Sequence, residues 1–374
     1  MRNILVVTPN YPIEGNPVYP FVKKLCDEFA KNGWKVTVLA NQSVTSSLLH
    51  HKSRRPKMRS YDIGGEEVVV YQPYTITPPH GLLWLYNYMI RLSILRFLRK
   101  NKLMPDVCYC HFWCSAYWVM PYMKKYNIPV FVASGESQIK TLLYSGKQYP
   151  DFINYVKGVI SVSGKNKDES IGLGYTTENK CIVMPNAVDS KHFYKRDKLN
   201  CRRKLGLPEK DFIVVFVGWF IERKGPLRVA EAINRAGGGV KSIFIGKGPQ
   251  EPQCQGILHK GSMPHEDIPL YLGAADCFVL PTLHEGCCNA VVEALACGLP
   301  VISSNLPFNW DVLDETNSIL VNPQNVDEIA NAIHELRDNP QKRELLADGA
   351  LKKAESLTID QRANKIMNFI EERL

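Results

Sequence analysis

Short apolar runs alternate with amphipathic stretches along this chain, and the alternation predicts repeated strand and helix units. Residues 3–8 form an apolar run that is typical of a buried parallel strand. A helix is expected over 20–32, because apolar residues recur along one face and Gly33 follows as a stop signal. Residues 34–39 should form the next strand, so the chain is predicted to open with a βαβ unit. No G-x-G-x-x-G follows the first strand, which weakens a dehydrogenase interpretation.

The same order of elements is predicted for residues 276–304. An apolar strand over 276–280 leads into a loop, and a helix follows from about Asn289 to Cys297. Gly298 and Pro300 end this helix, and the next strand begins with the following residue. Strand, loop, helix and strand in this order are typical of a parallel sheet.

Two acidic residues give this segment its candidate chemistry. Glu285 lies in the loop and Glu293 lies inside the predicted helix. If both were helical, their carboxylates would share one side of the helix, about 12 Å apart. Amide groups at the helix start would face outward and suit a phosphate or pyrophosphate; they belong to Gly286, Cys287, Cys288 and Asn289. This combination suits a nucleotide-sugar, which has hydroxyls at both ends and a diphosphate between them. The alternative is a solvated pair, but an unpaired charge within the apolar helix would be costly.

Length and composition narrow the class of protein. With 374 residues, of which 45% are hydrophobic, the chain can bury a large core and should form two domains. The net charge of +9 suits an anionic ligand, an anionic membrane surface or nucleic acid, and nucleic acid is not expected because no such motif occurs. Eleven scattered cysteines, no long apolar run and no secretory leader favour a cytoplasmic protein.

Two basic stretches of the sequence are compatible with a membrane contact. A long helix is predicted over 82–103, and it carries both aromatic and basic residues: Trp84, Tyr86, Tyr88, Arg91, Arg96, Arg99, Lys100 and Lys102. Such a helix can lie on a membrane surface or pack in the core, and the two interpretations are compatible. Residues 43–60 are polar and basic, and they should form a mobile surface loop or contact an anionic membrane or acceptor. A peripheral contact at the inner face of a membrane is therefore possible.

The segment from Pro281 to Val301 resembles the E-x7-E signature of retaining glycosyltransferases of family 4, the group 1 glycosyltransferases. Asn186 and Asp189 also match the family's inter-domain element, in which Ala187 replaces a glycine. The resemblance covers nearly the whole chain and is strongest over 212–305. It implies the GT-B fold, an α/β architecture of two Rossmann-like, doubly wound parallel-sheet domains that face a cleft.

The resemblance also implies that the two domains bind different substrates. Residues 1–190 would bind the acceptor, and residues 191–358 would bind the nucleotide-sugar. The last helix, 359–374, is expected to cross back to the first domain. A glycine turn with Gly246 and Gly248 should lie beside the nucleotide, and Gly218 begins a loop into a helix.

Lys224 stands at that helix start, where a compact charge can meet a diphosphate. The family has an Arg five residues before this Lys, but Trp219 stands there, so Arg223 is a candidate for the missing charge. On the acceptor and sugar side, Gly15 lies in the first loop, and a strand end carries Ser134, Gly135 and Glu136. Family members often have a His at that strand end. His111 at another strand end is a candidate substitute, and a hydrogen-bonded core histidine is the alternative.

The expected activity is that of a retaining hexosyltransferase. It would move a sugar from a UDP- or GDP-linked donor to a glycan or lipid-linked acceptor, in cell-surface polysaccharide assembly, without a metal or other cofactor. Glu293 would bind the ribose, Glu285 the sugar, and Lys224 with Arg223 the diphosphate. Two alternatives remain: a nucleotide-sugar-binding subunit without turnover, and a GT-B sugar-nucleotide isomerase or hydrolase.

Overall fold

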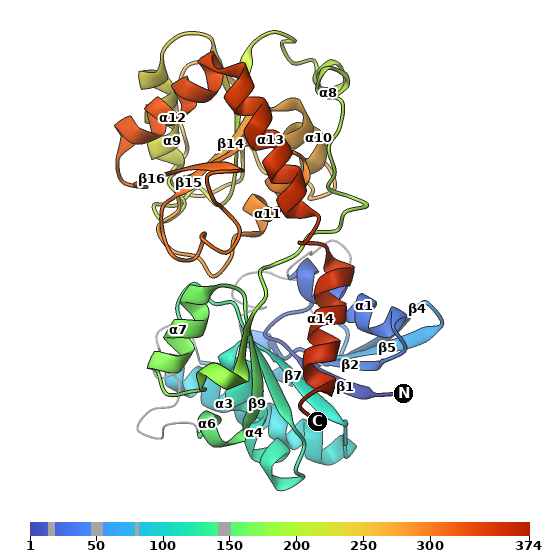
Figure 1. Cartoon of the computed structure of the whole chain (residues 1–374). Coiled ribbons are helices and arrows are strands. Elements are labelled where there is room, and N and C mark those ends of the chain that lie inside the picture. Colours follow the sequence, from blue (N-terminus) through green and yellow to red (C-terminus); the bar gives the residue numbers. More distant parts are fainter. Residues whose placement is uncertain (14–18, 46–54, 79–81, 141–150) are drawn as a thin grey trace. The chain divides into compact units, whose positions relative to one another are not determined.

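The computed structural model describes residues 1–13, 19–45, 55–78, 82–140 and 151–374. The chain forms two compact units (Figure 1). The first contains Met1–Met184 together with Ile359–Leu374, and the second is Pro185–Thr358. Each unit is built on its own sheet with helices packed against it.

The first unit has an eight-stranded sheet. Its strands are β1 (Asn3–Val7), β2 (Lys35–Leu39), β4 (Met58–Ile63), β5 (Glu66–Tyr71), β7 (Val107–His111), β8 (Val130–Ser134), β9 (Val156–Ser161) and β10 (Cys181–Val183). Their spatial order is β10-β9-β8-β7-β1-β2-β5-β4, and all neighbours are parallel except β4 and β5. Two short strands, β3 (Gln42–Ser43) and β6 (Tyr74–Thr75), pair separately.

Both faces of this sheet are covered, as strands with continuous apolar runs require. Alternate residues of β1 point to opposite faces, so Ile4 and Val6 belong to one core and Leu5 and Val7 to the other. The first core is closed by α1 (Pro20–Lys31) and α14 (Ile359–Glu371), and the second by α3 (Leu83–Asn101) and α4 (Trp113–Lys125). The unit also contains α6 (Phe152–Tyr155), α7 (Gly164–Gly172) and a 3-10 turn, η1 (Glu178–Lys180).

The second unit has a six-stranded sheet in which every pair is parallel. Its order is β13-β12-β11-β14-β15-β16, formed by β11 (Phe212–Val217), β12 (Val240–Ile245), β13 (Ile257–Gly261), β14 (Cys277–Leu280), β15 (Val301–Ser304) and β16 (Ser318–Val321). The helices are α8 (Lys198–Leu205), α9 (Pro226–Ala236), α10 (Ile268–Ala274), α11 (Asn289–Ala296), α12 (Val326–Asp338) and α13 (Pro340–Ala354). Because β11 and β14 are neighbours, the loops that follow them emerge side by side.

The predicted architecture of two α/β units with parallel sheets is confirmed. The first unit ends at Met184, whereas the sequence placed the boundary at residue 190. The reason is local: Asn186 bonds to the loop before α11, and the Val188 amide donates to Leu357 O at 2.8 Å, so this segment packs with the second unit. Helix α14 packs beside α1 in the first unit (Figure 1).

The surface loop predicted over residues 43–60 ends earlier than expected. Strand β4 begins at Met58 and pairs with β5 across a turn at Gly64 and Gly65. Both glycines have positive φ, which suits a tight hairpin and is the signal that marks it in the sequence. Residues 46–54 of that segment lie outside the described residues. Among the described helices, none is both long and apolar enough to cross a membrane.

Candidate functional site

The loops after β11 and β14 bring the predicted cations and one predicted carboxylate together. Lys224 Nζ lies 2.6 Å from Glu285 Oε1, and Arg223 Nη1 lies 2.5 Å from the same oxygen. Thr282 Oγ1 donates a third hydrogen bond to that oxygen at 3.1 Å. Glu285 therefore holds two positive groups at the carboxyl edge of the sheet, where α/β folds bind their ligands.

The two cations differ in their exposure to solvent. The Lys224 side chain is 10% exposed, and that of Arg223 is 34% exposed. Burial by itself lowers the pKa of Lys224, but Cys288 once it ionises, together with the charge and hydrogen bond of Glu285, outweighs burial, so the pKa is raised overall. Lys224 is therefore a fixed positive charge at neutral pH.

Helix α11 begins beside this ion pair. Its N-cap residue, Cys288, makes no side-chain capping hydrogen bond, and its Sγ lies 3.6 Å from Lys224 Nζ. Burial raises the pKa of the Cys288 thiol, so the thiol is neutral. The partial positive charge of a helix start thus lies next to a lysine, an arrangement that favours an anion.

Asn186 fixes the loop that leads into α11. Its Nδ2 donates to Cys287 O at 2.9 Å and to Asn289 Oδ1 at 2.8 Å. Gly286 lies between Glu285 and this tether. The family's Pro-Asn-x-Val-Asp pattern identified Asn186 in the sequence. It did not predict the contacts of Asn186 with Cys287 and Asn289.

Glu293 lies on α11 and has a partner that the sequence did not reveal. Its Oε1 is 2.9 Å from His265 Nε2, and the glutamate side chain is largely buried. The His265 ring packs against Phe193, with the ring centroids 5.2 Å apart. Residues 260–265 resemble a family loop that lies near the base, but His265 was missed as an individual site residue.

The glycine turn packs against the loop after β11. A Cβ atom on Gly246 would lie 1.9 Å from Gly218 O, and one on Gly248 would lie 2.3 Å from Phe220 O. The two backbones can approach this closely only because these residues lack side chains. Trp219 is 57% exposed at this edge, and Lys247 Nζ lies 5.8 Å from the centroid of its ring. Lys247 is a further cation near the position where the family has an Arg, and the sequence interpretation did not single it out.

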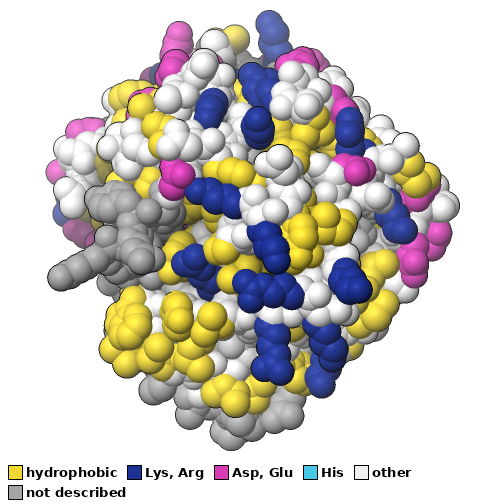
Figure 2. Space-filling model, turned by 90° about the horizontal axis from the view of Figure 1, so that it is seen from below, with side chains coloured by type: hydrophobic (Ala, Val, Ile, Leu, Met, Phe, Trp, Pro, Cys, Tyr) yellow, Lys and Arg dark blue, Asp and Glu magenta, His cyan; other side chains and the backbone are white. Residues whose placement is uncertain are grey.

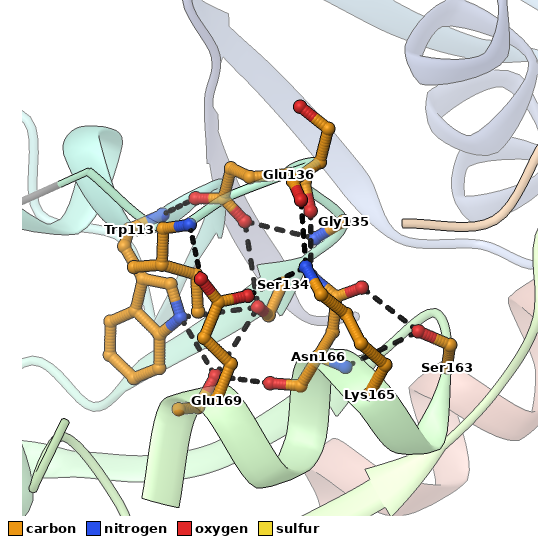
Figure 3. Close-up of polar contacts among 11 residues, drawn as sticks. Trp113, Ser134, Gly135, Glu136, Ser163, Lys165, Asn166 and Glu169 are labelled. Atoms are coloured by element: carbon orange, nitrogen blue, oxygen red, sulfur yellow. Dashed lines mark hydrogen bonds and ion pairs between the residues drawn. The ribbon is translucent and has the colours of Figure 1, made fainter. Parts of the chain in front are cut away.

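In the first unit, three residues predicted for the acceptor side, Ser134, Gly135 and Glu136, lie at the end of β8 (Figure 3). Glu136 Oε1 accepts from the Trp113 amide at 2.8 Å, and its Oε2 accepts from the Gly135 amide at 3.0 Å. The carboxylate thereby occupies the start of α4. Burial raises the pKa of Glu136 to about 7, although these amides favour its charged form.

Ser134 is buried and bonded within the protein. Its Oγ accepts from Trp113 Nε1 at 3.2 Å and lies 3.3 Å from Ser170 Oγ on α7 (Figure 3). The loop after Ser134 is held by α7 as well, because Asn166 Nδ2 donates to Glu136 O at 2.8 Å. Ser134 thus has a clear packing role, and its hydroxyl also donates a longer hydrogen bond to Glu136 Oε2, at 3.5 Å.

His111 ends β7 and is buried among aromatic rings. The centroids of Phe112 and Phe21 lie 4.4 Å and 5.2 Å from that of its ring. Burial lowers the pKa of His111 to about 3, so the ring is neutral, and Nδ1 has no hydrogen-bond partner among the described residues. Phe112 has a φ of +83°, a strained value for a bulky residue. Gly15 lies outside the described residues.

Comparisons with known proteins identify the family of the chain. Residues 20–192 match the model of Glycosyltransferase Family 4, and residues 197–353 match that of Glycosyl transferases group 1. The chain is 28% identical over 356 residues to the putative teichuronic acid biosynthesis glycosyltransferase TuaC of Bacillus subtilis, covering 88% of each protein. It is 32% identical over 198 residues to an Escherichia coli UDP-Gal:alpha-D-GlcNAc-diphosphoundecaprenol alpha-1,3-galactosyltransferase, covering 48% of this chain and 51% of the relative.

Solved structures share the fold. Sucrose-phosphate synthase from Thermosynechococcus elongatus has a TM-score of 0.78 at 18% identity, with 100% of this chain and 99% of that chain covered. Anabaena HepE in complex with UDP-glucose has a TM-score of 0.72 at 16% identity, with both chains fully covered. These neighbours have the GT-B fold, as the sequence predicted. The two family models together account for most of the chain, which belongs to glycosyltransferase family 4, the group 1 glycosyltransferases.

Proposed function

We propose that this glycosyltransferase is a retaining, metal-independent enzyme that transfers a hexose from a UDP- or GDP-linked donor to a glycan or lipid-linked acceptor. The observation that carries the proposal is the contact of Glu285 with both Lys224 and Arg223, beside the start of α11. Cations and a helix start suit a diphosphate, and a carboxylate suits sugar hydroxyls. One site thus offers both kinds of partner that a nucleotide-sugar needs.

Each group in the second unit has a role in this proposal. Lys224, Arg223 and the amides at the start of α11 stabilise the negative charge that grows on the leaving diphosphate. Glu285 accepts hydrogen bonds from the sugar hydroxyls and holds the anomeric carbon in position. Glu293 accepts hydrogen bonds from the ribose hydroxyls, with His265 orienting its carboxylate. Gly218, Gly246 and Gly248 let the backbone lie close to the nucleotide.

Retention follows if the acceptor attacks the face from which the diphosphate departs. The bond from the anomeric carbon to the diphosphate oxygen breaks, and the acceptor oxygen bonds to the same carbon. The acceptor's proton passes to an oxygen of the leaving phosphate, so the step requires no protein nucleophile. In the first unit, Glu136 and the loops at Gly15, Ser134 and Gly135 form the acceptor side, and His111 with its unpartnered nitrogen is a second candidate there.

The relatives favour work on cell-surface polysaccharides. TuaC is named for teichuronic acid biosynthesis, and the E. coli relative is named for a diphosphoundecaprenol-linked acceptor. The second name describes a lipid-linked acceptor, which suits an enzyme that works in the cytoplasm at the inner face of the membrane. We extend this setting to the present chain as part of the proposal.

Turnover of labelled donors tests the proposal. The protein is incubated with UDP- and GDP-hexoses, with and without undecaprenyl-diphosphate-linked sugars, and the nucleoside diphosphate and the product anomer are measured. Acceptor-dependent release with retained configuration is expected. Glu285→Gln should lower turnover by about 10²-fold or more, while Glu344→Gln, which changes an exposed carboxylate on α13, should not.

Four results would contradict the proposal in different ways. Release of sugar without acceptor would indicate a hydrolase, and an inverted product would exclude retention. Tight donor binding without turnover, under every acceptor and in the presence or absence of EDTA and Mg²⁺, would favour a binding subunit. Activity that depends on added metal would remove the metal-independent part alone.

A further inference from the structure

One face of α3 exposes a regular series of side chains to solvent. Trp84, Tyr88 and Leu92 are 53%, 46% and 50% exposed, and the exposed Arg96 and Lys100 continue the series. The five residues are four positions apart, so each lies about 40° further around the helix than the one before, and the series winds across the exposed side of α3. We call this series the α3 stripe. Its first half is aromatic and aliphatic, and its second half is basic.

The opposite side of α3 fixes the helix firmly in the first unit. Ile90, Ile94 and Leu98 are buried in the core that α3 shares with α4. Trp118 Nε1 on α4 donates to Asn87 Oδ1 at 3.0 Å, and both residues are buried. The stripe is thus a rigid surface on an ordered helix, and its exposure does not result from a loosely packed element.

The surroundings of the stripe are apolar and positively charged. Leu82 and Leu83 at the start of α3 are also about half exposed. From residue 68 to residue 135 the sequence contains seven Lys and Arg residues but only one acidic residue, Asp106. Figure 2 shows Lys and Arg side chains gathered among hydrophobic ones on the face seen from below. Five of the seven cations lie on α3 or directly after it: Arg91, Arg96, Arg99, Lys100 and Lys102.

This combination matches the boundary of a lipid bilayer. Tryptophan and tyrosine favour the headgroup level, leucine favours the acyl boundary, and arginine and lysine favour anionic headgroups. A second copy of the chain fits the surface less well, because α3 carries several Arg and Lys residues and no acidic residue, so both copies would bring net positive charge to the contact. Charge complementarity therefore favours an anionic occupant that also accepts apolar side chains.

We propose that the α3 stripe docks the protein onto an anionic lipid bilayer. Trp84, Tyr88 and Leu92 enter the headgroup and upper acyl region, and Arg96 and Lys100 contact the anionic headgroups. The inference rests on the proposed function only in its purpose, which is to keep the enzyme beside a lipid-linked acceptor. Binding to lipid itself requires neither donor nor turnover, so the two proposals can fail separately.

Vesicle co-sedimentation of the full chain tests the docking. Vesicles of phosphatidylcholine alone are compared with vesicles that contain phosphatidylglycerol, at low and high salt. The protein should sediment with the anionic vesicles, and binding should weaken as salt rises. Trp84→Ala/Leu92→Ala and Arg96→Gln/Lys100→Gln should each bind at least tenfold more weakly. The matched control, Lys210→Gln/Lys352→Gln, removes two exposed charges from the second unit and should bind as the parent does.

Unchanged binding in both stripe variants, or no binding of the parent to anionic vesicles, would overturn the proposal. A concentration-dependent dimer that both stripe variants abolish would also overturn it, in favour of an interface between copies. Thermal unfolding verifies that the variants fold. We expect them to fold because the substituted side chains are exposed to solvent. Donor binding by calorimetry, measured in parallel, should be unchanged in the stripe variants, and a loss of donor binding in the parent would count against the proposed function instead.

Discussion

Replacing Lys224 by methionine should destabilise the second unit. The substitution keeps most of the aliphatic length but removes the charge that lies 2.6 Å from Glu285 Oε1. Removing one partner of a buried ion pair costs about 3–5 kcal/mol, because the other charge is left without compensation. Glu285 keeps its contacts with Arg223 and Thr282, which places the expected cost near the lower limit, about 3 kcal/mol.

The unit Pro185–Thr358 has about 170 residues, and in a domain of this size 1 kcal/mol shifts the midpoint by about 2–4 °C. Lys224→Met should therefore lower the midpoint of this unit by about 6–12 °C in scanning calorimetry. Arg223→Met is the matched control. It removes a charge from the same carboxylate oxygen, but its side chain is 34% exposed, so the loss should be about 1 kcal/mol or less.

The double variant Lys224→Met/Glu285→Gln separates a lost ion pair from lost packing. It removes both charges, so it should be more stable than Lys224→Met alone by 1 kcal/mol or more, about 2–4 °C. The reasoning would be refuted if Lys224→Met and Arg223→Met shifted the midpoint equally. It would also be refuted if adding Glu285→Gln to Lys224→Met did not raise the unfolding midpoint.

Three further changes have expected outcomes. Glu293→Gln should weaken binding of the donor about tenfold or more in calorimetry, because hydrogen bonds to a charged group become bonds to a neutral one; unchanged affinity would contradict the ribose assignment. Because the pKa of Glu136 is raised to about 7, its contribution to stability is complete below about pH 4.5 and declines as the pH rises through 7. The unfolding midpoint of Glu136→Gln should therefore fall less between pH 5 and pH 8 than that of the parent. Equal falls in the two proteins would contradict this role of Glu136. Gly246→Ala should lower both the midpoint and donor affinity, since its Cβ would meet Gly218 O, whereas Gly238→Ala meets nothing within 4 Å and should do neither.

The order of elements could be predicted because each one carries its own local signal. Helix α11 was expected over residues 289–297 and spans Asn289–Ala296, since Gly298 and Pro300 end it. The opening unit followed in the same way from the apolar run of β1 and from Gly33, whose φ is +79°. Hairpin β4–β5 was missed because its outer strand is half exposed and carries no apolar run.

Pairings between side chains could not be predicted in this way. Lys224 and Glu285 meet because β11 and β14 are neighbours in the sheet, although β12 and β13 come between them in the chain. No local pattern encodes that order of strands. The same limit explains why the His265 contact with Glu293 was missed, and why Ser134 gave no sign that Trp113 and Ser170 surround it.

The contact between Glu285 and Lys224 has a consequence for selectivity. The Glu285 carboxylate is an ion-pair partner of Lys224 within the protein, so it competes for the lysine with any incoming anion. Under the proposed function, free orthophosphate or a bare nucleotide displaces the carboxylate from Lys224 and leaves it with Arg223 and Thr282 alone. A sugar nucleotide brings hydroxyl donors for the displaced carboxylate in the same event. The ion pair would thus disfavour the phosphates that are abundant in cells. It would favour a ligand that offers an anion to Lys224 and hydroxyl donors to Glu285.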